Sequence, residues 1–239
     1  MRTPASLALR IACLLSLVGC GRGQPAGRSG PASRAATRPA AAGWTPLFPA
    51  DSLAGWRVSH WSDLRLPQQV EGQAWKAEGD VLYGLGKRTW LYSQAEYGDF
   101  EMTFEVRISQ GANGGVGLRF PPAGDPAYTG MELQVVDHEV YYRGRSRPEQ
   151  RTASIYDEIA ADAAPSPVDA WTAWRITLLG RRVTIAVDGR VVLDADLSAE
   201  TQARQQKGPA LAERPLRGRI GFQNLNGQIT FRKLRIRRR

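Results

Sequence analysis

The stretch "FEMTFEVRI", Phe100 to Ile108, decides the fold class. Apolar side chains stand at every second position of it, and the side chains between them are charged or polar. A period of two is typical of a β-strand that has one buried face and one face toward water. We therefore predict a strand whose core-facing residues are Phe100, Met102, Phe104, Val106 and Ile108.

The same alternation recurs along the chain, and helical patterns are scarce. Asp188-Gly189 predicts a hairpin turn within 181–197, and Asn226-Gly227 predicts another within 217–236. Many short strands joined by Gly, Asn and Asp turns predict an all-β fold, an antiparallel sandwich or jelly roll. The other alternating stretches are "WKAEGDVLYGLG" (75–86), "GVGLRF" (115–120), "MELQVV" (131–136), "WRITLLG" (174–180) and "RRVTIAVDGRVVLDADL" (181–197).

The beginning of the chain is typical of an export signal. The apolar run 11–19 follows two arginines and is too short to span a bilayer. Its end, Leu-Val-Gly followed by Cys20, resembles the lipobox of bacterial lipoproteins. We therefore expect residues 1–19 to be removed and Cys20 to carry a lipid that anchors the protein in the bacterial cell envelope, facing the periplasm or the surface. An ordinary signal with an incidental cysteine is the alternative.

A tether and one large domain follow the signal. Residues 20–43 are rich in Gly, Pro, Ala and Arg, have no large apolar side chain, and are expected to be a disordered tether. Residues 44–239 are long enough for one sizeable domain. Cys13 leaves with the signal and Cys20 would be modified, so this domain has no cysteine for a nucleophile, a disulfide or a zinc site.

The charge balance is basic. The formal net charge is +9, and removal of the signal leaves 30 Lys and Arg against 23 Asp and Glu, or +7. The excess lies in the tether and in the terminal "RKLRIRRR". We therefore expect phospholipid head groups near the anchor, and not nucleic acid, as the counter-charge.

Residues 44–239 resemble the 3-keto-disaccharide hydrolase domain family nearly end to end. "GANGGVGLRF" (111–120) stands where that family has Asn-Ser-Gly-Ile followed by Arg, and "TGMELQVVD" (129–137) matches its Gly-x-Glu-x-Gln-x-x-Asp. Gly114 replaces the usual Ser, and Asn226 stands where the family often has His. The other matching segments are "GWTPLFPADSLAGW" (43–56), "YGDFEMTFEVRI" (97–108), "ASIYDEIA" (153–160) and "RGRIGFQNLNGQITFRKLRI" (217–236).

The resemblance implies a concanavalin A-like jelly roll of two antiparallel sheets that acts on, or binds, sugars. The family's proposed chemistry cleaves a glycoside oxidised at C3, by elimination and hydration, with net hydrolysis. The C3 carbonyl acidifies the C2 proton, so the reaction needs a base, an acid for the leaving oxygen, and a group that holds the enolate. On this basis Glu132 and Asp137 are the catalytic candidates, with Arg119 or a bound divalent cation at the enolate oxygen.

The polar faces of the predicted strands supply a binding surface. We expect Phe120 to face the core and Arg119 to face outward, into a concave surface shared by neighbouring strands. Carboxylate, amide and guanidinium groups bind sugar hydroxyls, and aromatic rings stack on sugar faces. Stacking is expected from Trp61, Trp90, Tyr128 and Tyr141, and the substrate-binding candidates are Glu105, Asn113, Arg119, Gln134, Tyr156, Asp157, Arg175 and Gln223.

Plainer interpretations stay open at this point. Glu132 and Gln134 are also suited to be cross-strand partners of Arg119 on a solvated sheet. Asp137 is also suited to a local turn. At the level of function, the rival is a lectin-like module that binds glycan without cleaving it, and an envelope scaffold is a third reading. One fold hosts both enzymes and binders, so the fold does not choose between them.

Overall fold

The computed structural model describes residues 43–239 apart from 69–71, 166 and 200–206. The predicted signal, Cys20 and all but the last residue of the predicted tether therefore lie outside the described residues. Within the described ranges, no helix has the length and apolar character needed to cross a bilayer.

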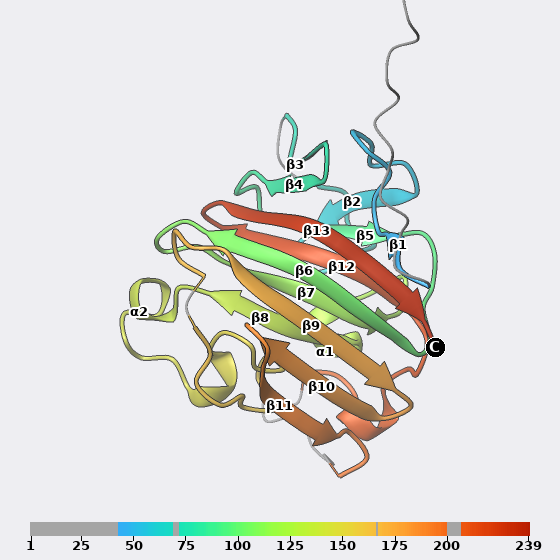
Figure 1. The fold of residues 1–239 in the computed structure, drawn as a ribbon, viewed down its shortest axis with the longest axis vertical. Helices are drawn as coiled ribbons and strands as arrows, with labels where there is room; N and C mark the ends of the chain where they lie inside the picture. The colour runs from blue at the N-terminus through green and yellow to red at the C-terminus, as the bar shows by residue number, and fades with distance from the viewer. Residues whose placement is uncertain (1–42, 69–71, 166, 200–206) are drawn as a thin grey trace, which may run out of the picture. The chain divides into compact units, whose positions relative to one another are not determined.

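Two antiparallel sheets pack face to face (Figure 1), as the sequence predicts. The large sheet has eight strands, and β1 (Thr45–Pro46) pairs with β13 beside the main path. The order of that path is β11 (Arg190–Asp196), β10 (Arg182–Val187), β9 (Thr172–Leu179), β6 (Phe100–Ile108), β13 (Ile229–Arg238), β4 (Val81–Gly84) and β3 (Trp75–Glu78).

The small sheet has five strands. Its order is β2 (Trp56–His60), β5 (Thr89–Ser93), β12 (Arg219–Asn226), β7 (Asn113–Phe120) and β8 (Met131–Val136). Four short helical turns lie in the connections: α1 (Pro126–Thr129), α2 (His138–Tyr141), η1 (Pro148–Gln150) and η2 (Leu211–Glu213).

Of the two predicted hairpins, one is confirmed and one is wrong. Asp188 and Gly189, with φ of 48° and 82°, join the paired strands β10 and β11. At Asn226-Gly227 the chain instead crosses from β12 in the small sheet to β13 in the large sheet. Strand β12 already pairs with β5 on one side and β7 on the other, so it has no edge left for β13.

The inward faces of the two sheets meet in one apolar core. Phe104 and Ile176 from the large sheet and Leu118, Leu133 and Phe222 from the small sheet are each at most 2% exposed. Burial of this kind contributes about 25 cal/mol for each Å² of apolar surface removed from water. The alternation read from the sequence therefore describes these strands correctly.

A second apolar cluster lies on the outer face of the small sheet. It consists of Leu64, Trp90, Tyr92 and Phe120, whereas Leu91, between the two β5 aromatics, belongs to the main core. The expectation that Phe120 faces the core and Arg119 faces outward is therefore wrong. Arg119 has a φ of 51°, and the register of β7 with β12 shifts beside it, which reverses the two residues.

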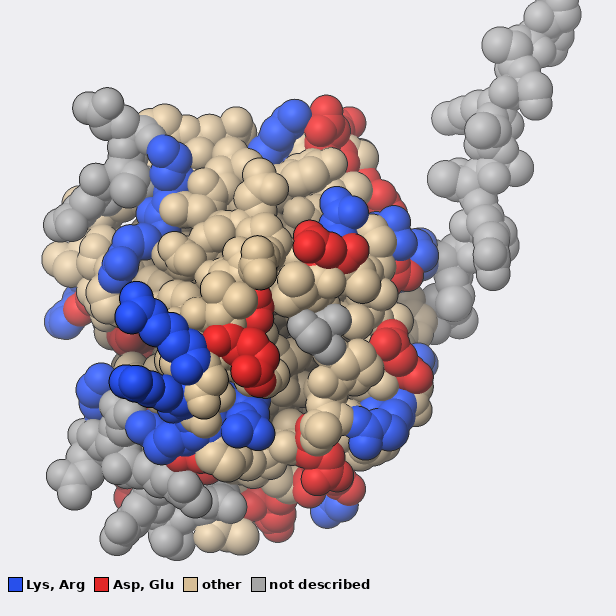
Figure 2. All heavy atoms as spheres, turned by 90° about the vertical axis from the view of Figure 1, so that its left-hand side faces the viewer, with Lys and Arg blue, Asp and Glu red and all other residues tan. Residues whose placement is uncertain are grey.

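Charged side chains are spread unevenly over the surface. On the face shown in Figure 2, Lys and Arg gather along one flank, Asp and Glu lie near the middle, and both kinds mix along the other flank. Strand β13 alone, "ITFRKLRIRR", carries five Lys and Arg. The basic excess of the described chain is thus concentrated and not uniform.

Candidate functional site

A hollow of about 380 Å³ lies on the outer face of the small sheet. Its floor comes from three adjacent strands: Asn113 on β7, Glu132 and Gln134 on β8, and Gln223 on β12. Leu133 lies in the core between Glu132 and Gln134, which confirms that both polar side chains point outward. The walls of this small-sheet hollow come from Trp61, Ser62, Asp125, Ala127, Tyr128, Tyr156, Lys207 and Leu225.

Glu132 is a buried carboxyl group whose protonated form the fold favours. Its side chain is 3% exposed, and burial raises its pKa well above the ordinary value, with repulsion from Asp125 and Asp157 acting in the same direction. Within the described residues its Oε1 has no hydrogen-bond partner. A carboxyl group of raised pKa is suited to donate a proton to a bound molecule.

Three buried oxygens of the floor lack partners among the described residues. They are Oδ1 of Asn113, Oε1 of Glu132 and Oε1 of Gln134, and all three residues line the small-sheet hollow. Buried polar groups without partners are costly, so they are uncommon unless a ligand or water completes them. Sugar hydroxyls are donors of the kind that would satisfy these acceptors.

Asp125 is a second carboxyl group of raised pKa in the wall. It precedes Pro126 and caps α1, and its Oδ1 accepts a hydrogen bond from the Ala127 amide at 3.1 Å. Burial raises its pKa to about 7, although the Ala127 amide and the charge of Lys207 oppose the rise. Asp125 cannot be recognised as a site residue from the sequence, because "GDPAY" (124–128) signals only a helix cap.

Aromatic side chains form part of the wall. The rings of Tyr128 and Tyr156 lie 6.3 Å apart, and the Tyr128 hydroxyl donates to Oδ2 of Asp157 at 3.3 Å. Asp157 is 1% exposed, forms an ion pair with Arg147, and accepts a hydrogen bond from Gln150 at 3.1 Å. Asp157 therefore supports the wall from behind and does not line the hollow itself.

A buried ion pair fixes the helix that carries Asp125. Arg214 and Glu158 are both 3% exposed at their side chains and are bonded to each other. Arg214 also donates to the carbonyl of Gly130, just after α1, at 2.8 Å. Removing one partner of such a pair leaves a buried charge, so the arrangement holds α1 in place.

The structure brings together part of the predicted site. Asn113, Glu132, Gln134, Tyr156 and Gln223 line one hollow, together with Trp61 and Tyr128 of the predicted aromatics. Trp90 is wholly buried in the outer cluster, where its Nε1 donates to the carbonyl of Trp61 at 2.9 Å, so it is not free to stack on a sugar. Tyr141 does not line the hollow and packs edge-on against Tyr142.

Arg119 does not reach the hollow. Its side chain is buried and donates to the carbonyls of Gly98 and Gly180, and to Oδ1 of Asp99 at 2.9 Å. These bonds tie the end of β7 to the β9–β10 turn of the large sheet. The expected enolate ligand is therefore a structural link between the sheets.

Asp137 is also placed elsewhere. Its Oδ2 accepts a hydrogen bond from the Gly111 amide at 2.9 Å, and its Oδ1 accepts one from the Val140 amide at 3.4 Å. It caps α2 and does not line the small-sheet hollow. The local-turn interpretation is the one that the geometry supports.

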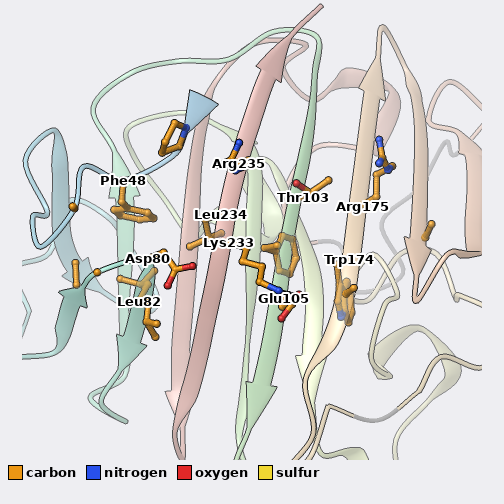
Figure 3. A pocket seen from close by; sticks show the side chains of 18 of the residues that line it. Phe48, Asp80, Leu82, Thr103, Glu105, Trp174, Arg175, Lys233, Leu234 and Arg235 are labelled. Carbon is orange, nitrogen blue, oxygen red and sulfur yellow. Dashed lines mark hydrogen bonds and ion pairs between the residues drawn. The ribbon is translucent and has the colours of Figure 1, made fainter. Parts of the chain in front are cut away.

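Glu105 and Arg175 lie on the large sheet, so the expectation of one shared concave face is wrong. Glu105 pairs with Arg232 and Lys233, each at 2.6 Å, and Arg175 pairs with Glu101 at 3.3 Å. Both residues line a second hollow of about 940 Å³, shown in Figure 3, on the outer face of the large sheet. The two sheets turn their outer faces away from each other, because their inner faces share the core.

A divalent cation has no evident ligand set in the described part of the chain. No three His, Cys, Asp or Glu side chains gather there as a metal site.

Comparisons with known proteins agree with this fold. The family model described as "3-keto-alpha-glucoside-1,2-lyase-like domain" matches residues 43–237. A candidate glycosyl hydrolase from Parabacteroides distasonis has a similar solved structure, with a TM-score of 0.69, 23% identity, and coverage of 82% of this chain and 99% of that one. Another from the same organism has a TM-score of 0.66 at 17% identity, covering 82% and 94%. No functionally curated protein matches the chain.

Proposed function

The chain belongs to the 3-keto-alpha-glucoside-1,2-lyase-like domain family, and on that basis we propose that it cleaves glycosides oxidised at C3 by elimination followed by hydration. A carbohydrate-related function follows from membership itself. One observation carries the finer proposal: two carboxyl groups of raised pKa, Glu132 and Asp125, line the same small hollow. Paired acids of this kind are what proton abstraction and leaving-group protonation require.

The first half of the reaction is elimination. With a pKa of about 7, Asp125 is partly ionised at neutral pH and removes the C2 proton as the base. The electron pair moves to the C3 oxygen as an enolate. When the C3 carbonyl re-forms from the enolate, the C1–C2 double bond forms and the C1 oxygen leaves. The leaving oxygen takes its proton from the protonated carboxyl group of Glu132.

Hydration completes the net hydrolysis. Ionised Glu132 takes a proton from water as the hydroxyl adds to C1, and C2 receives a proton from Asp125, so both carboxyl groups regain their starting states and one water is consumed for each bond cleaved. The enolate needs a positive partner in place of Arg119. Among the described residues that line the small-sheet hollow, Lys207 supplies the positively charged side chain. Its Nζ lies 5.2 Å from the centre of the Tyr128 ring.

Binding without cleavage is the second candidate. The unpartnered oxygens of Asn113 and Gln134 would bind sugar hydroxyls whether or not a bond breaks. The two candidates separate when purified protein is given a 3-keto glucoside with a chromogenic aglycone. Release by the wild type, reduced about 10²–10⁴-fold in Glu132→Gln, supports the enzyme. Saturable binding with no release in the wild type supports the lectin-like module.

A lipid anchor belongs to the same proposal. Cys20, at the end of the signal-like run, would be the lipidated residue, and it would hold the domain in the bacterial cell envelope, facing the periplasm or the surface. The test is fractionation of cells that express wild type or Cys20→Ser. The proposal expects wild type in the membrane pellet and the variant outside it, and a variant that stays in the pellet contradicts it.

A further inference from the structure

We infer that the outer face of the large sheet is a second carbohydrate site, which binds an acidic polysaccharide chain bearing carboxylate or sulfate groups. The 940 Å³ hollow shown in Figure 3 would form this site, on the opposite side of the sandwich from the proposed catalytic hollow. Arg235 and Lys233 on β13, Thr103 and Glu105 on β6, and Arg175 on β9 follow one another across it. We call it the large-sheet hollow.

Small side chains in the middle of the face leave this hollow open. Arg175 is paired across the strands with Thr103 on one side and Ala186 on the other, and Ala173 is paired with Glu105. Short side chains therefore alternate with long charged ones across the centre of the sheet. The result is a recess in which cationic groups stand beside an uncharged floor, which suits a chain-like ligand better than a flat one.

The central strands of this face carry more basic than acidic side chains, and the hollow itself is lined by Arg175, Lys233 and Arg235 against Asp80 and Glu105. On the central strands β6, β9 and β13, the outward-facing charged residues are six basic and two acidic, a surplus of four. Glu101 is already paired with Arg175 and Arg237, and Glu105 with Arg232 and Lys233. Within the described residues no ion pair neutralises Arg107 or Arg235, so the surplus is available to an anionic ligand.

Two tryptophans hold the guanidinium groups in position. Arg107 and Arg232 lie over the Trp171 ring at 5.0 and 4.1 Å, and Arg175 and Arg237 lie over the Trp44 ring at 5.7 and 4.7 Å. These contacts restrict long side chains before any ligand arrives. Preorganised cations lose less conformational entropy on binding, which favours recognition of spaced acidic groups.

A membrane surface is the competing partner for a basic face. Anionic head groups would be attracted to the same arginines, but a flat bilayer would leave the recessed floor of the large-sheet hollow uncovered. A polysaccharide chain can lie in the recess and present one acidic group for each sugar residue. The geometry therefore favours the polysaccharide.

The experiment measures binding of the purified full-length protein to polygalacturonate, to neutral dextran and to vesicles that contain phosphatidylglycerol. The variant Lys233→Gln/Arg235→Gln removes two exposed cations that line the large-sheet hollow. The control Arg143→Gln/Arg145→Gln removes the same charge from an exposed segment away from the large-sheet hollow. That segment follows α2, which comes directly after β8 of the small sheet.

The inference predicts binding to polygalacturonate and not to dextran. We expect it to weaken about tenfold in Lys233→Gln/Arg235→Gln and by less than twofold in the control. Release of aglycone from a small 3-keto glucoside should be equal in the two variants, so this test does not depend on the proposed reaction. Equal losses in both variants, or no binding to polygalacturonate, would overturn the inference. If binding to the vesicles depends on Lys233 and Arg235 and binding to polygalacturonate does not, the inference is overturned in favour of a membrane surface.

Discussion

Gly115 lies directly against the carboxyl group of Glu132: a Cβ atom at position 115 would stand 2.3 Å from Oε1 of Glu132. The same atom would stand 2.7 Å from the carbonyl oxygen of Leu133, so the backbone of β8 leaves no room for it either. The absence of a side chain at position 115 of β7 is therefore what allows the carboxyl group of Glu132 to lie on the floor of the small-sheet hollow.

The first prediction concerns this contact. In Gly115→Ala, the Glu132 side chain or strand β8 must shift by an ångström or more, and a shift of that size costs roughly a hundredfold in turnover. Aglycone release from a 3-keto glucoside measures it. The control is Gly98→Ala, because a Cβ atom there meets nothing within 4 Å. Full activity in Gly115→Ala would show that the position of Glu132 is not needed.

The second prediction is a pH dependence of stability that comes from Asp125. Its pKa is about 7 in the folded protein and 3.8 ordinarily, so between these values the folded state binds the proton that the unfolded state has released. The contribution of Asp125 to the free energy of unfolding is therefore complete below about 3.8 and is lost as the pH rises through about 7. Asp125→Asn removes this contribution.

Urea unfolding of wild type and Asp125→Asn across that pH range measures the difference. The free energy of unfolding of the wild type relative to Asp125→Asn should fall steadily from pH 4 to pH 7. A difference that stays constant, or rises, would mean that the Asp125 carboxyl keeps an ordinary pKa.

The third prediction separates structure from catalysis at Arg119. Arg119→Met leaves the carbonyls of Gly98 and Gly180 without their donor, and should lower the free energy of unfolding by about 2–4 kcal/mol. Turnover of a 3-keto glucoside, measured well below the unfolding temperature, should stay within twofold of wild type. A large loss of turnover in a stable variant would return Arg119 to the reaction, as the sequence alone suggests.

Much of the fold could be predicted because alternation and turn chemistry are local signals. The strand at Phe100–Ile108 and the hairpin at Asp188-Gly189 are both set by residues that are neighbours in the sequence. Asn226-Gly227 gives the same turn signal, yet it joins different sheets, because β12 is paired on both sides by strands far away in the chain. Pairing of that kind leaves no trace in the turn itself.

The site could be predicted only where its residues follow the alternation. Glu132 and Gln134 point outward because Leu133 points inward. Arg119 does not follow the alternation, because its positive φ exchanges the faces to which Arg119 and Phe120 point. A positive φ at an arginine cannot be predicted from composition or spacing. The sequence does not single out Asp125, because the raised pKa of its carboxyl depends on burial, which only the folded chain supplies.

The fourth prediction tests Asp137 as a cap. Asp137→Ala removes the acceptors of the Gly111 and Val140 amides, and should lower the free energy of unfolding by about 1 kcal/mol. Aglycone release should be retained within twofold. If release fell as far as in Glu132→Gln while stability was unchanged, Asp137 would be a catalytic group after all.

The elimination mechanism is tested most directly by the isotope at C2 of the released 3-keto sugar. When wild-type protein cleaves a 3-keto glucoside in D₂O, the elimination mechanism predicts one deuterium at C2 by mass spectrometry, above the exchange seen without protein, because the proton that Asp125 removes exchanges with solvent before Asp125 returns one to C2. Product formation should be strongly reduced in Asp125→Asn. Product that forms at the wild-type rate without deuterium at C2 would contradict the account, because the C1 bond would then have been cleaved without removal of the C2 proton.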